Sequence, residues 1–358
     1  MDDKNINRLN DEIIYGGVAK PRDVYNCFKN FVKDWNFLKR RIELGDLQYE
    51  YIYYTYFIRD SVFEDLIIGI IDIYWASRKA DEERTKKILE DFYPRMLYSG
   101  ERVTINSDKL IEALSPNNRE DYAIFNAFEY IGRMIEGVDK DYIIFIDSCC
   151  RIIKSKEIRN LKLGVHVDNL LQNSELFESV YKNMLLNEKI SDWRNVANHD
   201  NYQILDNGVN VTLGQGDSLR NKMYTFKEIK LLAKTIEVLT YAQKIALTMI
   251  INDLGDEIIE IRKRIVKSEN KRRDDIIAQL VENSLFLGYK LEGIDWEKKE
   301  IWFTEMTSNK KTMEKLMMIS DGLIESQEYS YYFKWKGSVH FSTSFIDGKR
   351  MVYEWKVE

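Results

Sequence analysis

Apolar residues recur every three or four positions over most of residues 20–255, which is the spacing of amphipathic helices. We expect helices at about residues 24–42, 46–80, 81–97, 121–136, 141–156 and 174–186, with another beginning near Ser191. Pro94 is expected to end the third helix, and residues 99–118 to form a connection around a short helix. Thr225 and Glu228 have the spacing of a capping box, which predicts a long helix with an apolar side after residue 225.

The pattern changes to strict alternation in two regions, and alternation predicts strands. Residues 202–205 and 209–213 flank the turn sequence Asp206-Asn207-Gly208, so we expect a β-hairpin there. Residues 213–217 contain two glycines but no following Lys-Ser or Lys-Thr, so a turn is expected and not a phosphate loop. Residues 274–358 are expected to form an α+β unit, with helices at 276–287 and 312–320 and strands at 296–303, 329–335, 339–345 and 351–357.

These elements predict a mainly α protein, in which a helical bundle with a β-hairpin insertion is preceded by a helical region and followed by a small α+β domain. The expected domain limits are 1–115, 116–268 and 269–358. Seven basic residues between Arg262 and Arg273 mark the second boundary. Such a run is usually a solvated helix face. The alternative is contact with RNA phosphates through Arg262, Arg264, Lys271, Arg272 and Arg273.

The bulk composition is that of an ordinary globular protein, with 44% hydrophobic and 31% charged residues. The formal net charge is -6, so any nucleic-acid site has to be a local positive patch. The three cysteines, Cys27, Cys149 and Cys150, lack a disulfide spacing and indicate a reducing compartment. The first residues are polar and acidic, and the most apolar run, 66–73, is too short to cross a bilayer. We therefore expect a cytoplasmic protein without membrane contact.

One segment, residues 194–199, combines residue types that can cleave RNA without a metal. Arg194 is always charged, and its planar guanidinium fits a pair of phosphate oxygens. His199, one of 3 histidines, can deprotonate a ribose 2′-hydroxyl or protonate the leaving oxygen. Arg194 would also stabilise the charge that develops in the transition state.

A helical wheel separates the polar residues of this segment from the apolar ones. At about 100° per residue, roughly 140° of the circumference holds Arg194, Asn195, Asn198 and His199. The two asparagines are expected to orient the histidine or to bind the sugar. One helix supplies only one histidine, whereas the reaction benefits from both an acid and a base, so we expect a two-fold dimer to bring two copies together.

The segment 193–199, followed by Tyr202, a hairpin and a capped long helix, resembles the HEPN superfamily. The HEPN motif is an arginine, four to six residues of which the first is polar, and a histidine; Asn195 is that polar residue here. Many HEPN toxins have a tyrosine two residues after the histidine, and Tyr202, three residues after it, is expected to support the site.

The resemblance covers roughly residues 120–265. It implies a helical bundle, a dimer with a composite site, and metal-independent endoribonuclease activity with no cofactor. It also implies RNA as substrate, a role in a toxin–antitoxin or antiphage abortive-infection system, and an antitoxin or trigger protein as partner. The alternatives are a non-catalytic HEPN scaffold or nucleotide-binding interaction protein, and a protein in which the motif is accidental.

Other chemical candidates have a structural interpretation that we favour. The aromatic cluster at residues 49–57 lacks interleaved basic residues, so core packing is favoured over a base-stacking platform. His166 and His340 have no partner at ligand spacing, and the pair Cys149-Cys150 lies in an apolar helix. No cysteine and histidine cluster has zinc spacing, so no metal is expected.

Overall fold

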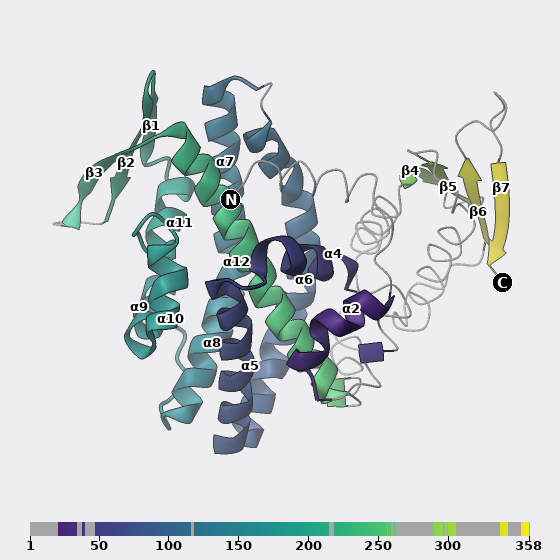
Figure 1. The fold of residues 1–358 in the computed structure, drawn as a ribbon, viewed down its shortest axis with the longest axis horizontal. Coiled ribbons are helices and arrows are strands. Elements are labelled where there is room, and N and C mark those ends of the chain that lie inside the picture. Colours follow the sequence, from purple (N-terminus) through teal and green to yellow (C-terminus); the bar gives the residue numbers. More distant parts are fainter. Residues whose placement is uncertain are drawn as a thin grey trace. The chain divides into compact units, whose positions relative to one another are not determined.

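The computed structural model describes residues 21–33, 38–39, 47–115, 118–214, 218–255, 257–258, 261, 289–295, 298, 300–305, 337–342 and 352–357. The contacts divide the chain into two compact units. One is Tyr53–Asp253, and the other combines Met1–Ile52 with Leu254–Glu358. The protein is mainly helical, as expected (Figure 1).

The unit Tyr53–Asp253 is a helical bundle with one small sheet. Its helical elements, of which η2, η3 and η4 are π-helical turns, are η2 (Tyr54–Ile58), α5 (Val62–Ala80), α6 (Glu82–Leu114), α7 (Glu120–Met134), η3 (Ile135–Asp139), α8 (Lys140–Ile153), α9 (Leu163–Asn173), α10 (Glu175–Glu178), η4 (Ser179–Asn183), α11 (Ile190–Asn198) and α12 (Phe226–Leu254). The shorter helices that precede the bundle are α2 (Pro21–Phe28), η1 (Lys29–Phe31) and α4 (Gln48–Tyr53).

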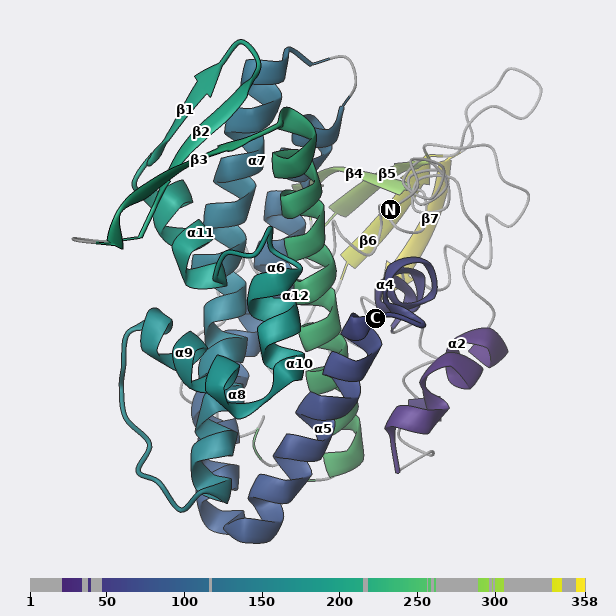
Figure 2. The same ribbon diagram turned by 60° about the vertical axis from the view of Figure 1, so that its left-hand side comes forward.

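The long helix α12 runs through the middle of the bundle (Figure 2). The predicted capping box begins it: the backbone N–H of Thr225 donates to Glu228 Oε2 over 2.7 Å, and the Glu228 N–H donates to Thr225 Oγ1 over 3.2 Å. The residues expected on its apolar side are buried, including Ile229, Leu232 and Ile236. The prediction of this helix is therefore confirmed.

Several expected helix limits are wrong. Helix α6 continues through Pro94 to Leu114, because the apolar side chains on both sides of the proline, such as Tyr93 and Val103, are buried and offset the lost hydrogen bond. The helix expected at 24–42 ends at Phe31, where the chain becomes extended. The helix expected at 46–80 is interrupted at Asp60, whose positive φ of 57° breaks it before Ser61 caps α5.

Helix α9 was not expected, and neither was the grouping of helices into units. Residues 163–173 carry a buried stripe of His166, Val167 and Leu170, which was not recognised as helical. Helices α5 and α6 pack on α7 and α8 within one unit, so the compact unit spans the expected limit at residue 115. Its other end, at Asp253, precedes the expected limit at residue 268.

The expected hairpin is part of a three-stranded antiparallel sheet of order β1-β2-β3. Strands β1 (Tyr202–Leu205) and β2 (Gly208–Leu213) pair as predicted, and β3 (Arg220–Tyr224) adds to β2. Strand β3 was not predicted because four of its five residues are exposed, so it lacks the alternation of a half-buried strand.

The second unit contains a four-stranded sheet of order β4-β5-β6-β7. Its strands are β4 (Tyr289–Asp295), β5 (Glu300–Glu305), β6 (Gly337–Ser342) and β7 (Val352–Val357). Strands β5 and β6 pair in parallel, while β6 and β7, which lie in the regions expected as strands at 339–345 and 351–357, pair antiparallel. The other elements expected in this region, at 276–287, 312–320 and 329–335, lie outside the described residues.

The aromatic cluster belongs to the core of the bundle. Tyr53 stacks on Tyr241 with 3.5 Å between ring centroids, and the Tyr53 hydroxyl donates to Glu237 Oε1 over 2.6 Å. Tyr54 and Phe57 are also buried. The packing interpretation of this cluster is confirmed.

A buried carboxylate joins η3 to α12. Asp139 Oδ1 accepts hydrogen bonds of 2.8 Å from Thr240 Oγ1 and from Gln243 Nε2, whereas Oδ2 has no hydrogen-bond partner among the described residues. Burial raises the pKa of Asp139 to about 7, and the two hydrogen bonds only partly oppose this. The π-helical turn η3 is thus anchored by a carboxyl group that titrates near neutral pH.

Candidate active site

The polar face of helix α11, which carries Arg194, is turned away from the bundle core because the opposite, apolar face is buried in it. Trp193 and Val196 are buried, and the Trp193 indole donates to the Leu185 carbonyl over 2.8 Å. A Cβ atom on Gly132 of α7 would lie 2.6 Å from Asn198 Oδ1 and 3.1 Å from Ala197 Cβ, so α7 and α11 approach closely at this glycine. The predicted apolar face of the segment is therefore confirmed.

His199 lies just beyond the helix and not inside it, which corrects the sequence-based placement. Helix α11 ends at Asn198, and Asp200 adopts a positive φ of 52°. The N–H of Asn201 donates to the carbonyl of Val196, five residues earlier, over 3.0 Å. This is the 6→1 hydrogen bond of a Schellman motif. This turn leads directly into β1 and leaves the His199 side chain exposed.

Arg194 is held in place by a carboxylate from another part of the bundle. Its Nε donates to Glu136 Oε2 over 2.7 Å, and a terminal nitrogen donates to Asn195 Oδ1 over 3.1 Å. The second oxygen of Glu136 accepts from Lys140 Nζ, also over 2.7 Å. Burial raises the pKa of Glu136, but the hydrogen bonds from Lys140 and Arg194 outweigh it, so the pKa lies below its usual value.

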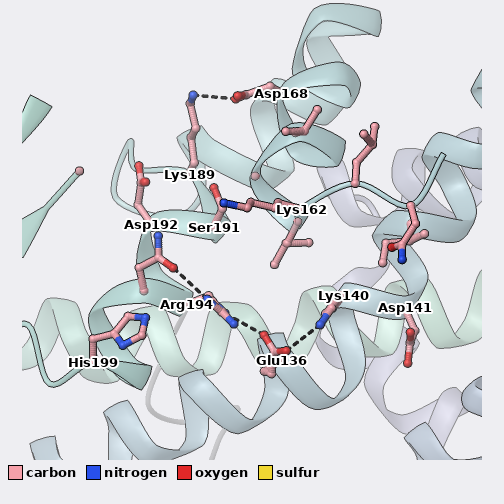
Figure 3. A pocket seen from close by; sticks show the side chains of 18 of the residues that line it. Glu136, Lys140, Asp141, Lys162, Asp168, Lys189, Ser191, Asp192, Arg194 and His199 are labelled. Carbon is pink, nitrogen blue, oxygen red and sulfur yellow. Dashed lines mark hydrogen bonds and ion pairs between the residues drawn. The ribbon is translucent and has the colours of Figure 1, made fainter. Parts of the chain in front are cut away.

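Arg194 and His199 line one cavity of about 1090 Å³, together with Asn195 (Figure 3). The cavity is at the upper end of the usual range for small-ligand sites, about 300–1,000 Å³. Its basic lining residues are Arg95, Arg102, Lys140, Lys162, Lys189 and Arg194. Its carboxylates are Glu136, Asp141, Asp168 and Asp192. The lining therefore has more positive than negative side chains, although the chain has a net charge of -6.

The other predicted site residues lie elsewhere or are not described. Tyr202 stacks on Phe128 with 4.0 Å between ring centroids and is absent from the cavity lining, and burial raises its pKa. Asn198 is exposed beside Gly132 and is also absent from the lining. The candidate phosphate contacts Arg262, Arg264, Lys271, Arg272 and Arg273 lie outside the described residues.

Most of the charged lining residues were missed from the sequence. Glu136 and Lys140 have the i,i+4 spacing of an ordinary helix-surface pair, which gives no sign of a site. Lys162 and Lys189 directly precede α9 and α11, and Arg102 lies on a helix that was expected to be a connection. No local signal distinguishes these cations from solvated surface residues.

Of the remaining candidates, His166, Cys149 and Cys150 are buried, as the structural interpretation expects. His166 is 1% exposed, and its Nδ1 lies 2.7 Å from Asp147 Oδ2. Burial raises the pKa of Cys149 to about 12 and that of Cys150 to about 11, so neither is a ready nucleophile. His340 lies on β6, in a predicted strand region. Among the described residues, no group of histidine, cysteine and carboxylate side chains could hold a metal ion.

Comparison with known proteins identified no relative, because no family model, curated protein or solved structure matches the chain. Within the described part of the chain, no helix combines the length and the apolar character that membrane crossing requires.

Proposed function

We propose that the protein is a metal-independent endoribonuclease of HEPN type, with Arg194 and His199 as its catalytic residues. The observation that carries this proposal is that both side chains line one cavity with a surplus of basic residues. A polyanion would otherwise be repelled by a chain of net charge -6.

The chemistry needs only the RNA and these two groups. Arg194 holds the non-bridging phosphate oxygens and stabilises the charge that builds up in the transition state. His199 removes the proton of the 2′-hydroxyl, whose oxygen attacks the adjacent phosphorus, or protonates the departing 5′-oxygen. The products are a 2′,3′-cyclic phosphate and a 5′-hydroxyl. Glu136 holds Arg194 through Nε and Asn195 holds it through one terminal nitrogen, so the remaining N–H groups of the guanidinium can bind phosphate.

The second acid–base group would come from a second copy of the chain. Arg194 and His199 of one protomer supply one histidine, and a homodimer with facing α11 helices would supply the other. Diluting the protein far below the dimer dissociation constant should therefore reduce activity more steeply than in proportion to concentration. A strictly proportional fall would contradict the composite site.

A cytoplasmic role in antiphage defence or in a toxin–antitoxin system follows from this activity. An RNA-cleaving toxin has to be restrained until needed, which calls for a neutralising partner or a trigger. Expression of the wild type should arrest growth, and the Arg194→Ala variant should not.

The direct test is cleavage of RNA in the presence of EDTA. Arg194→Ala and His199→Ala should each lower kcat by about 10³-fold or more, as removal of a principal charge-stabilising or acid–base group does. Arg133→Ala is the matched control, because Arg133 is exposed on α7, pairs with Glu129 and is absent from the cavity lining. The cleaved 3′ ends should carry a 2′,3′-cyclic phosphate. Equal cleavage by wild type and both cavity variants would refute the proposal.

The Glu136 contact favours one alternative, a non-catalytic nucleotide-binding protein. A guanidinium already held by a carboxylate can serve purely as an anion-binding group. In that case the purified protein would bind nucleotides, Arg194→Ala would weaken the binding, and no RNA would be cleaved under any condition.

A further inference from the structure

We propose that Arg102 and Lys162 bind a second phosphate of the RNA, next to the one that is cleaved. This inference rests on the proposed function and adds the size of the substrate to it. The enzyme would then prefer a strand with at least one phosphate flanking the scissile one over a dinucleoside monophosphate.

The first observation is how the cations of the cavity are paired. Four of the six have a carboxylate partner: Lys140 and Arg194 share Glu136, Arg95 lies 3.6 Å from Asp141, and Lys189 lies 2.7 Å from Asp168. Arg102 and Lys162 have no carboxylate partner among the described side chains. These two residues are therefore the cations of the lining whose charge is not offset by an ion pair with a described carboxylate.

The Arg102 side chain is held against η3 by a hydrogen bond to the backbone. Its guanidinium donates to the Gly137 carbonyl over 2.6 Å. A Cβ atom on Gly137 would lie 3.5 Å from the Arg102 side chain, so Arg102 lies against η3, the turn that also contains Glu136. One nitrogen of Arg102 is thus used for positioning, and its other donors remain available for an anion.

Lys162 reaches the same cavity from α9. The residue is exposed and directly precedes the helix, and Figure 3 shows its side chain extending towards Ser191, on the α11 side of the cavity. Helix α9 has no side-chain cap at its start, so the positive end of its dipole adds to the positive potential around Lys162. Arg102 and Lys162 define the subsite, and the N-terminus of α9 adds to its positive potential.

The size of the cavity fits more than one nucleotide. Its volume of about 1090 Å³ exceeds what a single phosphate held between Arg194 and His199 requires. A strand that enters with its scissile phosphate at Arg194 therefore has room for a neighbouring phosphate, and two cations without carboxylate partners are available to neutralise it.

The test compares substrates that differ by one terminal phosphate. A dinucleoside monophosphate NpN is cleaved alongside NpNp and pNpN, in EDTA. In the wild type, an added phosphate at one of the two ends should lower KM about tenfold with kcat unchanged, since a charge-assisted contact contributes about 1.5 kcal/mol. In the Arg102→Ala/Lys162→Ala double variant, the KM of NpN should no longer differ from that of NpNp or pNpN.

Three further variants of the protein act as controls. Lys87→Ala removes an exposed lysine that is absent from the cavity lining and should keep the full phosphate gain. Lys162→Arg and Arg102→Lys keep the charge and should retain a large part of it. Equal KM values for all three substrates in the wild type, or a gain that persists in the double variant, would overturn the inference.

A binding measurement separates this inference from the proposed function. The 2′-deoxy dinucleotides dNpdN, dNpdNp and pdNpdN cannot be cleaved by 2′-hydroxyl attack, so calorimetry measures their affinity whether or not the protein is a nuclease. An added phosphate that raises affinity about tenfold in the wild type, but not in the double variant, supports the subsite even if no RNA is cleaved. No gain at either end in the wild type overturns the subsite even if RNA is cleaved.

Discussion

His166 and His199 lie in the same bundle in opposite environments. His166 is fully buried on α9, with Nδ1 2.7 Å from Asp147, a pairing found in many catalytic sites. His199 is exposed at the end of α11 and lines the cavity that contains Arg194. By its partner alone His166 is the better catalytic candidate, yet only His199 is reachable by a substrate.

The difference lies in what each histidine contacts. Asp147 Oδ2 also accepts from Arg151 Nε over 2.9 Å and from Asn169 over 3.2 Å. Burial raises the pKa of Asp147, but the hydrogen bonds from His166 and Arg151 outweigh it and lower the pKa below its usual value. A network that satisfies a buried carboxylate in this way stabilises the junction of α8 and α9. Access to a charged cavity, rather than an aspartate partner, is therefore what makes His199 and not His166 the proposed catalytic histidine.

The largest expected difference between the two histidines is in stability. His166→Ala should lower the free energy of unfolding by about 3 kcal/mol, because it leaves a cavity and removes one of three partners from buried Asp147. His199→Ala, an exposed change, should stay within about 0.5 kcal/mol of the wild type. Urea unfolding monitored by circular dichroism measures both. A similar loss in the two variants would mean that His166 contributes no more to stability than the exposed His199 does.

The next largest effect concerns Asp139, the buried carboxyl group of η3. Because the pKa of Asp139 is raised to about 7 in the folded state, its protonated form favours folding, and this contribution is lost as the pH rises through 7. Between pH 5 and pH 8 the wild type should lose about 2–3 kcal/mol relative to Asp139→Asn, since one pKa unit corresponds to about 1.4 kcal/mol.

Chemical denaturation of both proteins across this pH range measures the effect. Asp91→Asn, an exposed change on α6, is the control and should follow the wild type at every pH. A constant difference between wild type and Asp139→Asn from pH 5 to pH 8 would contradict the assigned titration.

The smallest expected effect tests Glu136, which joins the cavity to η3. Glu136→Gln keeps a hydrogen-bond acceptor for Arg194 but removes the charge, so Arg194 should be held less firmly and kcat should fall about tenfold, with KM little changed. Glu129→Gln is matched to it, because Glu129 pairs with Lys109 and Arg133 away from the cavity. Activity above the wild-type level in Glu136→Gln would instead mean that Glu136 competes with phosphate for Arg194.

The elements that could be predicted are those whose signal is local. The capping box at Thr225 and Glu228, the hairpin around Gly208 and the buried face of α11 with Trp193 each depend on neighbouring residues. The continuation of α6 through Pro94 and the pairing of exposed β3 could not be predicted, because tertiary packing overrides the local preference at both places.

The sequence by itself determined that the segment with Arg194 and His199 has a polar side opposite an apolar one, because helical periodicity separates the two faces. Only the tertiary structure decided which charges surround them. Arg102, Glu136 and Lys162 come from α6, η3 and the start of α9, and nothing in their own neighbourhoods distinguishes them from solvated surface residues. Their convergence on one cavity follows from how the helices of the bundle pack, which is set by the buried side chains and not by the charged ones.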